Sequence, residues 1–103
     1  MEEEPVVVPI DGELDLHTFR PSEVSELVQD YLAECLAQRI LRVRIVHGKG
    51  TGALRATVHA ALDRCALVAN YRLAGPGEGS WGATIVHLCP VQGITEAVVD
   101  NLG

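Results

Sequence analysis

The spacing of apolar residues along the chain predicts four strands and two helices. Strands are indicated where apolar and polar residues alternate or where β-branched residues cluster, and helices where apolar residues recur every three or four positions. Pro21 suits the first turn of the first helix, because the N–H that proline lacks would have no helical partner there. In chain order we predict a strand at 13–17, a helix at 21–39, a strand at 41–46, a helix at 53–65, and strands at 67–73 and 83–88.

The order of these elements, β-α-β-α-β-β, predicts an α/β fold. Strand–helix–strand units normally place their two strands parallel and side by side, with a right-handed connection. We therefore expect a two-layer sandwich in which both helices pack on a mixed four-stranded sheet. Residues 13–88 would form the domain, residues 1–12 an extended lead-in, and residues 89–103 a tail with a short helix at 95–101.

Composition is ordinary for a single globular domain. The chain has 103 residues, of which 48% are hydrophobic and 21% charged. No apolar run approaches the roughly 20 residues of a membrane-spanning helix, and the acidic residues 2–4 argue against a secretory signal. The three cysteines form no CxxC pair, which argues against a structural zinc site and favours a reducing compartment. We expect a cytoplasmic monomer that does not contact a membrane.

Charge is distributed unevenly along the chain. The net charge is −6, but residues 1–34 hold ten acids and one base, residues 35–76 hold seven bases and one acid, and residues 77–103 hold three acids. The middle segment could therefore present a basic surface to nucleic acid even though the protein is acidic. The alternative is that its arginines are solvated on the faces of helices and strands.

Two of the predicted strands end in a histidine, His17 and His47. If these strands are parallel neighbours, both imidazoles lie at the same edge of the sheet, where ligands bind in open α/β sheets. Alternation places Asp15 on the same strand face as His17, about 7 Å away along the strand. In isolation, an acid and a histidine on a strand are more often surface residues than catalysts, but a second strand-end histidine favours a site.

A glycine-rich turn follows His47 and leads into the second predicted helix. Alternating glycines allow the backbone to approach a ligand closely, and a helix N-terminus attracts anions. The candidate phosphate-binding residues are Gly48, Lys49, Gly50, Thr51, Gly52 and Arg55, the last offering a bidentate guanidinium. The spacing is neither that of a Walker A loop nor that of a dinucleotide fingerprint. The alternative is a tight strand-to-helix turn that needs glycine for its backbone only.

Three further residues carry chemistry outside this turn. Trp81, in a glycine-rich loop, could stack on a base, although a role in covering the sheet edge is preferred. His59 follows Arg55 by four positions, and we expect it to be solvated on the outer face of the helix. His87 lies inside the last predicted strand and is expected to be structural or partly exposed.

The motifs LDLH at 14–17, HGKGTGALR at 47–55 and GSWGATIVHL at 79–88 resemble those of the Smr (small MutS-related) domain family, in particular its stand-alone bacterial members. The resemblance implies a fold like the C-terminal domain of translation initiation factor three, nucleic-acid binding and, in several members, endonuclease or nicking activity on DNA or RNA. By position, the LDxH motif supplies Asp15 and His17, the HGxG motif supplies His47, Gly48 and Gly50, and the arginine of the following helix is Arg55. Thr18 stands where many members have glycine.

Together these features favour phosphodiester cleavage. Asp15 would orient His17 as a general acid or base, and His47 would transfer a second proton or contact phosphate. Imidazoles titrate near neutral pH, so two of them can divide the acid and base roles without a metal. We expect no tightly bound cofactor, and Mg²⁺ or Mn²⁺ activation is left open. The alternatives are a non-catalytic nucleic-acid or phosphate-binding module and a protein–protein adaptor that uses the acidic first helix.

Overall fold

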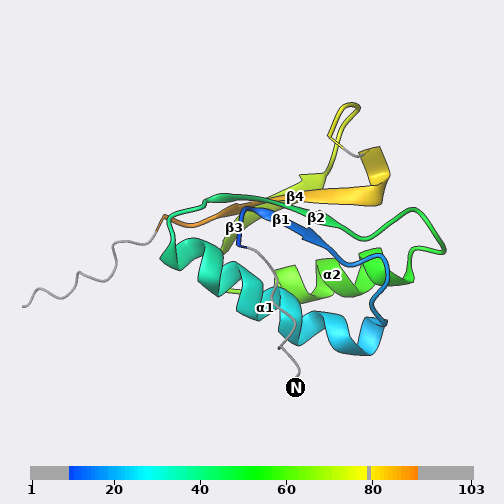
Figure 1. Ribbon diagram of the computed structural model, residues 1–103, viewed down its shortest axis with the longest axis horizontal. Coiled ribbons are helices and arrows are strands. Elements are labelled where there is room, and N and C mark those ends of the chain that lie inside the picture. The colour runs from blue at the N-terminus through cyan, green and yellow to red at the C-terminus, as the bar shows by residue number, and fades with distance from the viewer. Residues whose placement is uncertain (1–9, 79, 91–103) are drawn as a thin grey trace, which may run out of the picture.

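The computed structural model describes residues 10–78 and 80–90, and for Trp81 the main chain alone. The four strands and two helices predicted between residues 13 and 88 are confirmed, and their ends differ from the expected ones by about two residues or less. The elements are β1 (Glu13–Asp15), α1 (Pro21–Ala37), β2 (Arg42–Val46), α2 (Ala53–Asp63), β3 (Val68–Leu73), the 3₁₀ helix η1 (Ser80–Gly82) and β4 (Ala83–Leu88) (Figure 1). The η1 turn was not predicted, and the predicted tail helix lies outside the described residues.

The sheet is mixed, with strand order β1-β2-β4-β3. β1 and β2 are parallel neighbours, as expected, with Asp15 opposite Val46. The expectation that the strands flanking α2 would also be neighbours is wrong, because β4 lies between β2 and β3 and is antiparallel to both. The central position suits β4, in which every residue except His87 is buried, whereas β3 exposes Asn70 and Arg72 to solvent.

Both helices cover the same face of the sheet (Figure 1). α1 buries Val24, Val28 and Leu32 against this face, where they meet the inward-facing residues Val43 and Ile45 of β2 in one apolar cluster. Helix α1 begins with a reciprocal pair, since Glu23 N–H donates to the Arg20 carbonyl at 2.9 Å and the Glu23 carboxylate accepts from Arg20 N–H at 3.0 Å. No helix in the described ranges combines the length and apolar character needed to cross a membrane.

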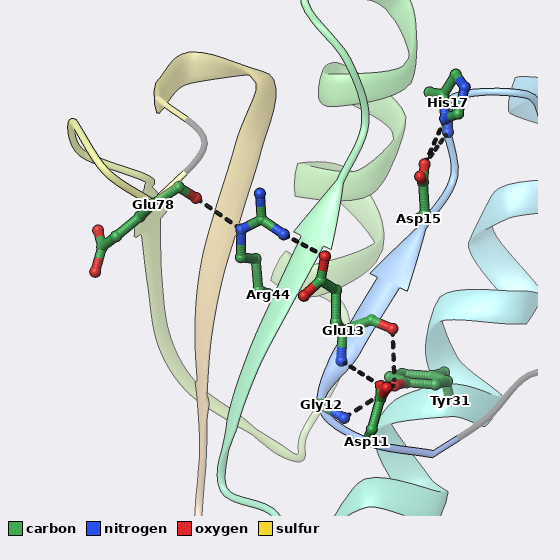
Figure 2. Close-up of polar contacts among 8 residues, drawn as sticks. All are labelled: Asp11, Gly12, Glu13, Asp15, His17, Tyr31, Arg44 and Glu78. Carbon is green, nitrogen blue, oxygen red and sulfur yellow. Dashed lines mark hydrogen bonds and ion pairs between the residues drawn. The ribbon is translucent and has the colours of Figure 1, made fainter.

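On the opposite face, the connection between β3 and β4 is held to the sheet by Glu78. The Glu78 carboxylate accepts hydrogen bonds from Arg42 at 2.8 Å and Arg72 at 3.0 Å. Its main-chain carbonyl accepts from Arg44 Nε at 2.7 Å, and the Arg44 guanidinium also pairs with Glu13 of β1 (Figure 2). Three arginines of the basic middle segment are therefore paired with carboxylates on the sheet, and they do not form the open basic surface that their charge suggested.

Candidate nucleic-acid-binding and catalytic site

The carboxyl ends of β1 and β2 lie side by side, as the sequence predicted. Leu16 N–H donates to the Val46 carbonyl at 2.7 Å, so the pairing continues beyond the last residue of β1. His17 and His47 both line one pocket of about 430 Å³ at this edge. The other lining residues are Pro21 and the continuous run from Gly48 to Arg55. The structure thus brings the strand-end histidines and the glycine-rich turn together.

Asp15 and His17 form a hydrogen-bonded pair at the end of β1 (Figure 2). The Asp15 carboxylate accepts from the ring Nδ1 of His17 at 2.6 Å and from its main-chain N–H at 3.1 Å. The hydrogen bond from the ring is the main cause that lowers the pKa of Asp15 below its usual value. A carboxylate only accepts hydrogen bonds, so Nδ1 carries the proton and, in the neutral ring, Nε2 keeps its lone pair. Both side chains are more than half exposed.

Two glycines allow the turn after β2 to pack against its neighbours. Gly48 has φ +83°, a left-handed conformation that favours glycine, and a Cβ there would lie 3.5 Å from the Cβ of His17. Gly82 approaches the turn from the η1–β4 junction, and its carbonyl accepts from the N–H groups of His47 at 3.0 Å and Gly48 at 2.9 Å. A Cβ on Gly82 would lie only 2.9 Å from Cγ of Lys49.

The N-terminus of α2 forms one wall of the pocket. Residues 50–55 line it, and the first turn presents the positive end of the helix dipole there. Lys49 and Arg55 add two positive charges to the same wall. Within the described part of the chain, no carboxylate pairs with the Arg55 guanidinium. This arrangement has the chemistry of an anion site, because helix N-termini and guanidinium groups both favour phosphate.

His47 lies beneath the surface of the pocket, with an exposed fraction of 3%. Its Nε2 is 2.8 Å from the hydroxyl of Thr84, and its Nδ1 is 3.2 Å from the carbonyl of Gly48. Burial lowers the pKa of His47 below its usual value, and the positive charge of Arg55 acts in the same direction. A catalytic role for His47 stays a prediction, but engagement of both ring nitrogens favours positioning over direct proton transfer.

The expectation that His59 would be solvated is wrong. Its ring is half-buried between His47 and Tyr71, with centroid distances of 6.0 and 4.8 Å, and its Nε2 is 2.8 Å from the hydroxyl of Thr84. The helical spacing of residues in α2 did not predict the contact between His59 and Thr84. A signal was available in β4, because a threonine at an inward-facing position of an apolar strand needs a hydrogen-bond partner in the helical layer.

Two other sequence predictions concern Trp81 and His87. The Trp81 side chain lies outside the described residues, so its proposed stacking or covering role stays a prediction. His87 is half-buried on the face away from the helices, where it is paired with Asn70 of β3, which agrees with the expectation of a structural or partly exposed residue. In the ranges 10–78 and 80–90, no three His, Cys, Asp or Glu side chains gather as metal ligands would.

Comparison with known proteins places this site in a family. The Smr domain model matches residues 14–89. The chain belongs to the Smr domain family. A curated relative, "Endonuclease MutS2" of Lachnoclostridium phytofermentans, is 44% identical over 78 residues, which cover 76% of this chain and 10% of that protein. The chain therefore spans about a tenth of the length of the curated relatives that it matches.

Solved structures of Smr domains share this fold. The Smr domain of Thermus thermophilus MutS2 superimposes with a TM-score of 0.74 at 40% identity, covering 78% of this chain and 100% of that domain. YdaL, a stand-alone small MutS-related protein from Escherichia coli, gives a TM-score of 0.70 at 29% identity, covering 75% of this chain and 63% of that chain. The family and the mixed α/β fold expected from the sequence are both confirmed.

Proposed function

We propose that this Smr domain binds DNA or RNA at the pocket between β1, β2 and α2 and cleaves phosphodiester bonds there. The observation that carries the proposal is the hydrogen-bonded Asp15–His17 pair, which lies at the same pocket as the anion-attracting N-terminus of α2. The name of the MutS2 relatives, which describes those proteins as endonucleases, supports the same chemistry. The chain matches only their Smr portion, so the activity is a proposal for this protein.

The proposed reaction is a displacement at phosphorus. Nε2 of His17 takes the proton of the attacking hydroxyl, which is water or, in RNA, the sugar 2′-hydroxyl. The new P–O bond forms as the bond to the leaving oxygen breaks, and the proton returns to that oxygen from His17 or from solvent. Asp15 stabilises the imidazolium that forms. Lys49 and Arg55 offset the negative charge that develops on the phosphoryl oxygens.

In this proposal His47 supports the turn and does not touch the substrate. His17 then supplies the one exposed imidazole of the proposed mechanism. A divalent cation could supply the second activating group. The proposal includes Mg²⁺ or Mn²⁺ as an activator that is not tightly bound, and an assay with each ion and with EDTA tests that part.

Two substitutions test the catalytic pair, His17→Ala and Asp15→Asn. We expect each to slow cleavage by about 10²-fold or more, the usual contribution of general acid–base catalysis. Nucleic-acid affinity should stay within a few-fold, since Lys49 and Arg55 remain. Labelled single- and double-stranded DNA and RNA would be followed by cleavage gels and mobility shifts.

His87→Ala is the matched control, because it removes a half-buried histidine from the sheet without touching the pocket. Its cleavage rate should equal that of the wild type. A wild-type protein that cuts none of the four substrates, with either ion present, would refute the nuclease proposal.

The burial of His47 favours a second candidate, a non-catalytic module that holds the nucleic-acid backbone. With the His47 ring covered, His17 is the one exposed imidazole among the described residues of the pocket, so no second histidine is there to protonate the leaving oxygen. This candidate predicts binding without any product, in the wild type as in His17→Ala. Absence of all nucleic-acid affinity would refute both candidates and leave the adaptor role of the acidic first helix.

A further inference from the structure

Three side chains from three separate parts of the fold form a hydrogen-bonded network beneath the pocket. His47 follows the end of β2, Thr84 belongs to β4 and His59 belongs to α2. The Thr84 hydroxyl lies 2.8 Å from Nε2 of His47 and 2.8 Å from Nε2 of His59. Thr84 is fully buried. On the other side of the His47 ring, Nδ1 lies 3.2 Å from the carbonyl of Gly48.

The direction of each hydrogen bond in this network follows from counting protons. A carbonyl oxygen only accepts, so Nδ1 of His47 carries a hydrogen and donates to Gly48. A neutral imidazole has one N–H, so Nε2 of His47 has a lone pair and accepts from the Thr84 hydroxyl. That hydroxyl has then used its only hydrogen, so Thr84 accepts from His59, whose Nε2 carries the N–H.

The surroundings of the two rings favour their neutral forms. Burial lowers the pKa of His47, as does the positive charge of Arg55, against the opposing effect of the hydrogen bond to Gly48. Burial also lowers the pKa of His59, and a positive charge on His47 or Arg55 would lower it further, against the opposing effect of Asp63. A second proton on Nε2 of His47 would point at an oxygen that already accepts from His59, and the buried Thr84 hydrogen would lose its acceptor. An unpaired buried polar group of this kind is costly.

His59 is itself held in place from the far side. Its ring lies 4.8 Å from that of Tyr71 at a tilt of 44°. The Tyr71 hydroxyl donates to Asp63 at 2.7 Å, one helical turn along α2 from His59. The donor nitrogen of His59 therefore has a fixed direction toward Thr84.

We propose that Thr84 and His59 are positioning residues that hold His47 in its Nδ1–H tautomer, and that this tautomer holds the Gly48 carbonyl and sets the backbone of the phosphate-facing turn. In a histidine ring, the hydrogen bond made by one nitrogen determines whether the other nitrogen carries the proton. In a trans peptide the N–H points opposite to the carbonyl, so holding the Gly48 carbonyl toward the His47 ring directs the Lys49 N–H away from it. The effect on catalysis rests on the proposed function. The tautomer of His47 and the conformation of the turn can be tested whether or not the protein cleaves nucleic acid.

Long-range ¹H–¹⁵N spectra of the histidine side chains, recorded on the full chain where the rings are neutral, test the proton arrangement directly. We expect His47 to show a protonated Nδ1 and an unprotonated Nε2, and His59 the reverse. His17 and His87 serve as internal references in the same spectrum. A His47 ring protonated at Nε2, or rapidly averaged between the two forms, would overturn the inference.

Four variants test whether the His47–Thr84–His59 hydrogen bonds set the conformation of the turn after β2. Thr84→Val removes the hydroxyl at nearly constant shape, and His59→Leu removes the donor. Both should abolish the single His47 tautomer and shift the main-chain amide signals of Gly48 and Lys49. Thr84→Ser and His59→Gln keep a hydroxyl and an Nε2 donor, so both should restore the wild-type signals. Unchanged signals in Thr84→Val and His59→Leu would contradict the proposal.

Cleavage assays separate this inference from the proposed function. With an active wild type, Thr84→Val should lose about 10- to 100-fold in rate at saturating nucleic acid, as small misplacements of a site do, and Thr84→Ser should recover it. With an inactive wild type, the spectra alone decide the inference. A Thr84→Val variant that folds and cleaves at the wild-type rate would overturn the positioning role even if the tautomer were as expected.

Discussion

At the scale of single residues, Gly48 contacts both His17 at the end of β1 and His47 at the end of β2. It accepts the hydrogen bond of His47 through its carbonyl, donates its N–H to Gly82, and lies against the Cβ of His17. Its φ of +83° is the kind of conformation that a side chain disfavours by about 1–2 kcal/mol. Gly48 thus allows the turn to lie close to the Asp15–His17 pair.

Gly48→Ala should therefore lower the free energy of unfolding by about 1–2 kcal/mol and weaken nucleic-acid binding, because the turn must shift to accommodate the strain. Gly50→Ala is the matched control for stability. A Cβ at Gly50 would meet nothing within 4 Å, and its φ lies outside the left-handed range. Urea unfolding and mobility-shift titrations of both variants provide the measurements, and equal stability of the two would contradict this explanation.

The residues whose position follows from strand ends could be predicted from the sequence, whereas those that depend on contacts between the helices and the sheet could not. His17, Lys49 and Arg55 line one pocket, and Asp15 is hydrogen-bonded to His17, because β1 and β2 are parallel, which the strand–helix–strand order predicts. The Thr84–His59 contact joins residues 25 positions apart. No local period encodes such a pairing, and only the packing of α2 on β4 creates it.

At the scale of elements, the connection between β3 and β4 leads β4 back antiparallel to β3 and brings Gly82 to the turn after β2. β4 lies in the centre of the sheet, between β2 and β3, which the order of the elements along the chain did not predict. Glu78 ties this connection to Arg42 and Arg72. The hydrogen bond from Arg72, assisted by the Gly75 N–H, lowers the pKa of Glu78 from 4.5 to about 2.

Because the pKa of Glu78 is depressed in the folded state, its ionised form stabilises the fold above pH 4.5, and this stabilisation is lost as the pH falls from 4.5 toward about 2. Glu78→Gln should therefore melt at a lower temperature than the wild type at neutral pH, and the two melting temperatures should converge near pH 2. Thermal melts across this range measure the difference. A constant difference at every pH would mean that the charge of Glu78 contributes nothing.

At the scale of the whole molecule, negative and positive charge occupy different parts of the fold. Four acidic residues of α1 are exposed: Glu23, Glu26, Asp30 and Glu34. On the sheet, arginines are paired with Glu13 and Glu78. Among the described residues, the pocket is lined by Lys49 and Arg55 and by no carboxylate. This distribution of charge favours a polyanion at the pocket and repels it along α1, so in the proposed function it would orient the protein on nucleic acid.

Arg55→Ala should weaken nucleic-acid binding and reduce the slope of log affinity against log salt concentration by about 1, because one phosphate contact is lost. Arg64→Ala is the control, since Arg64 follows the opposite end of α2 and its guanidinium donates to Ser25 at 3.0 Å. Fluorescence anisotropy with a labelled oligonucleotide at several salt concentrations provides both slopes. Equal slopes for the two variants would place the phosphate contact elsewhere.

The three cysteines differ in accessibility, which has a practical consequence. Cys35 and Cys65 are buried in the core, and burial also raises the pKa of the Cys35 thiol, whereas Cys89 is partly exposed just after β4. Its main chain is anchored by a hydrogen bond from Cys89 N–H to the Leu67 carbonyl. A thiol-directed dye would therefore attach at one defined position, away from the residues that line the pocket, and could report binding without mutagenesis.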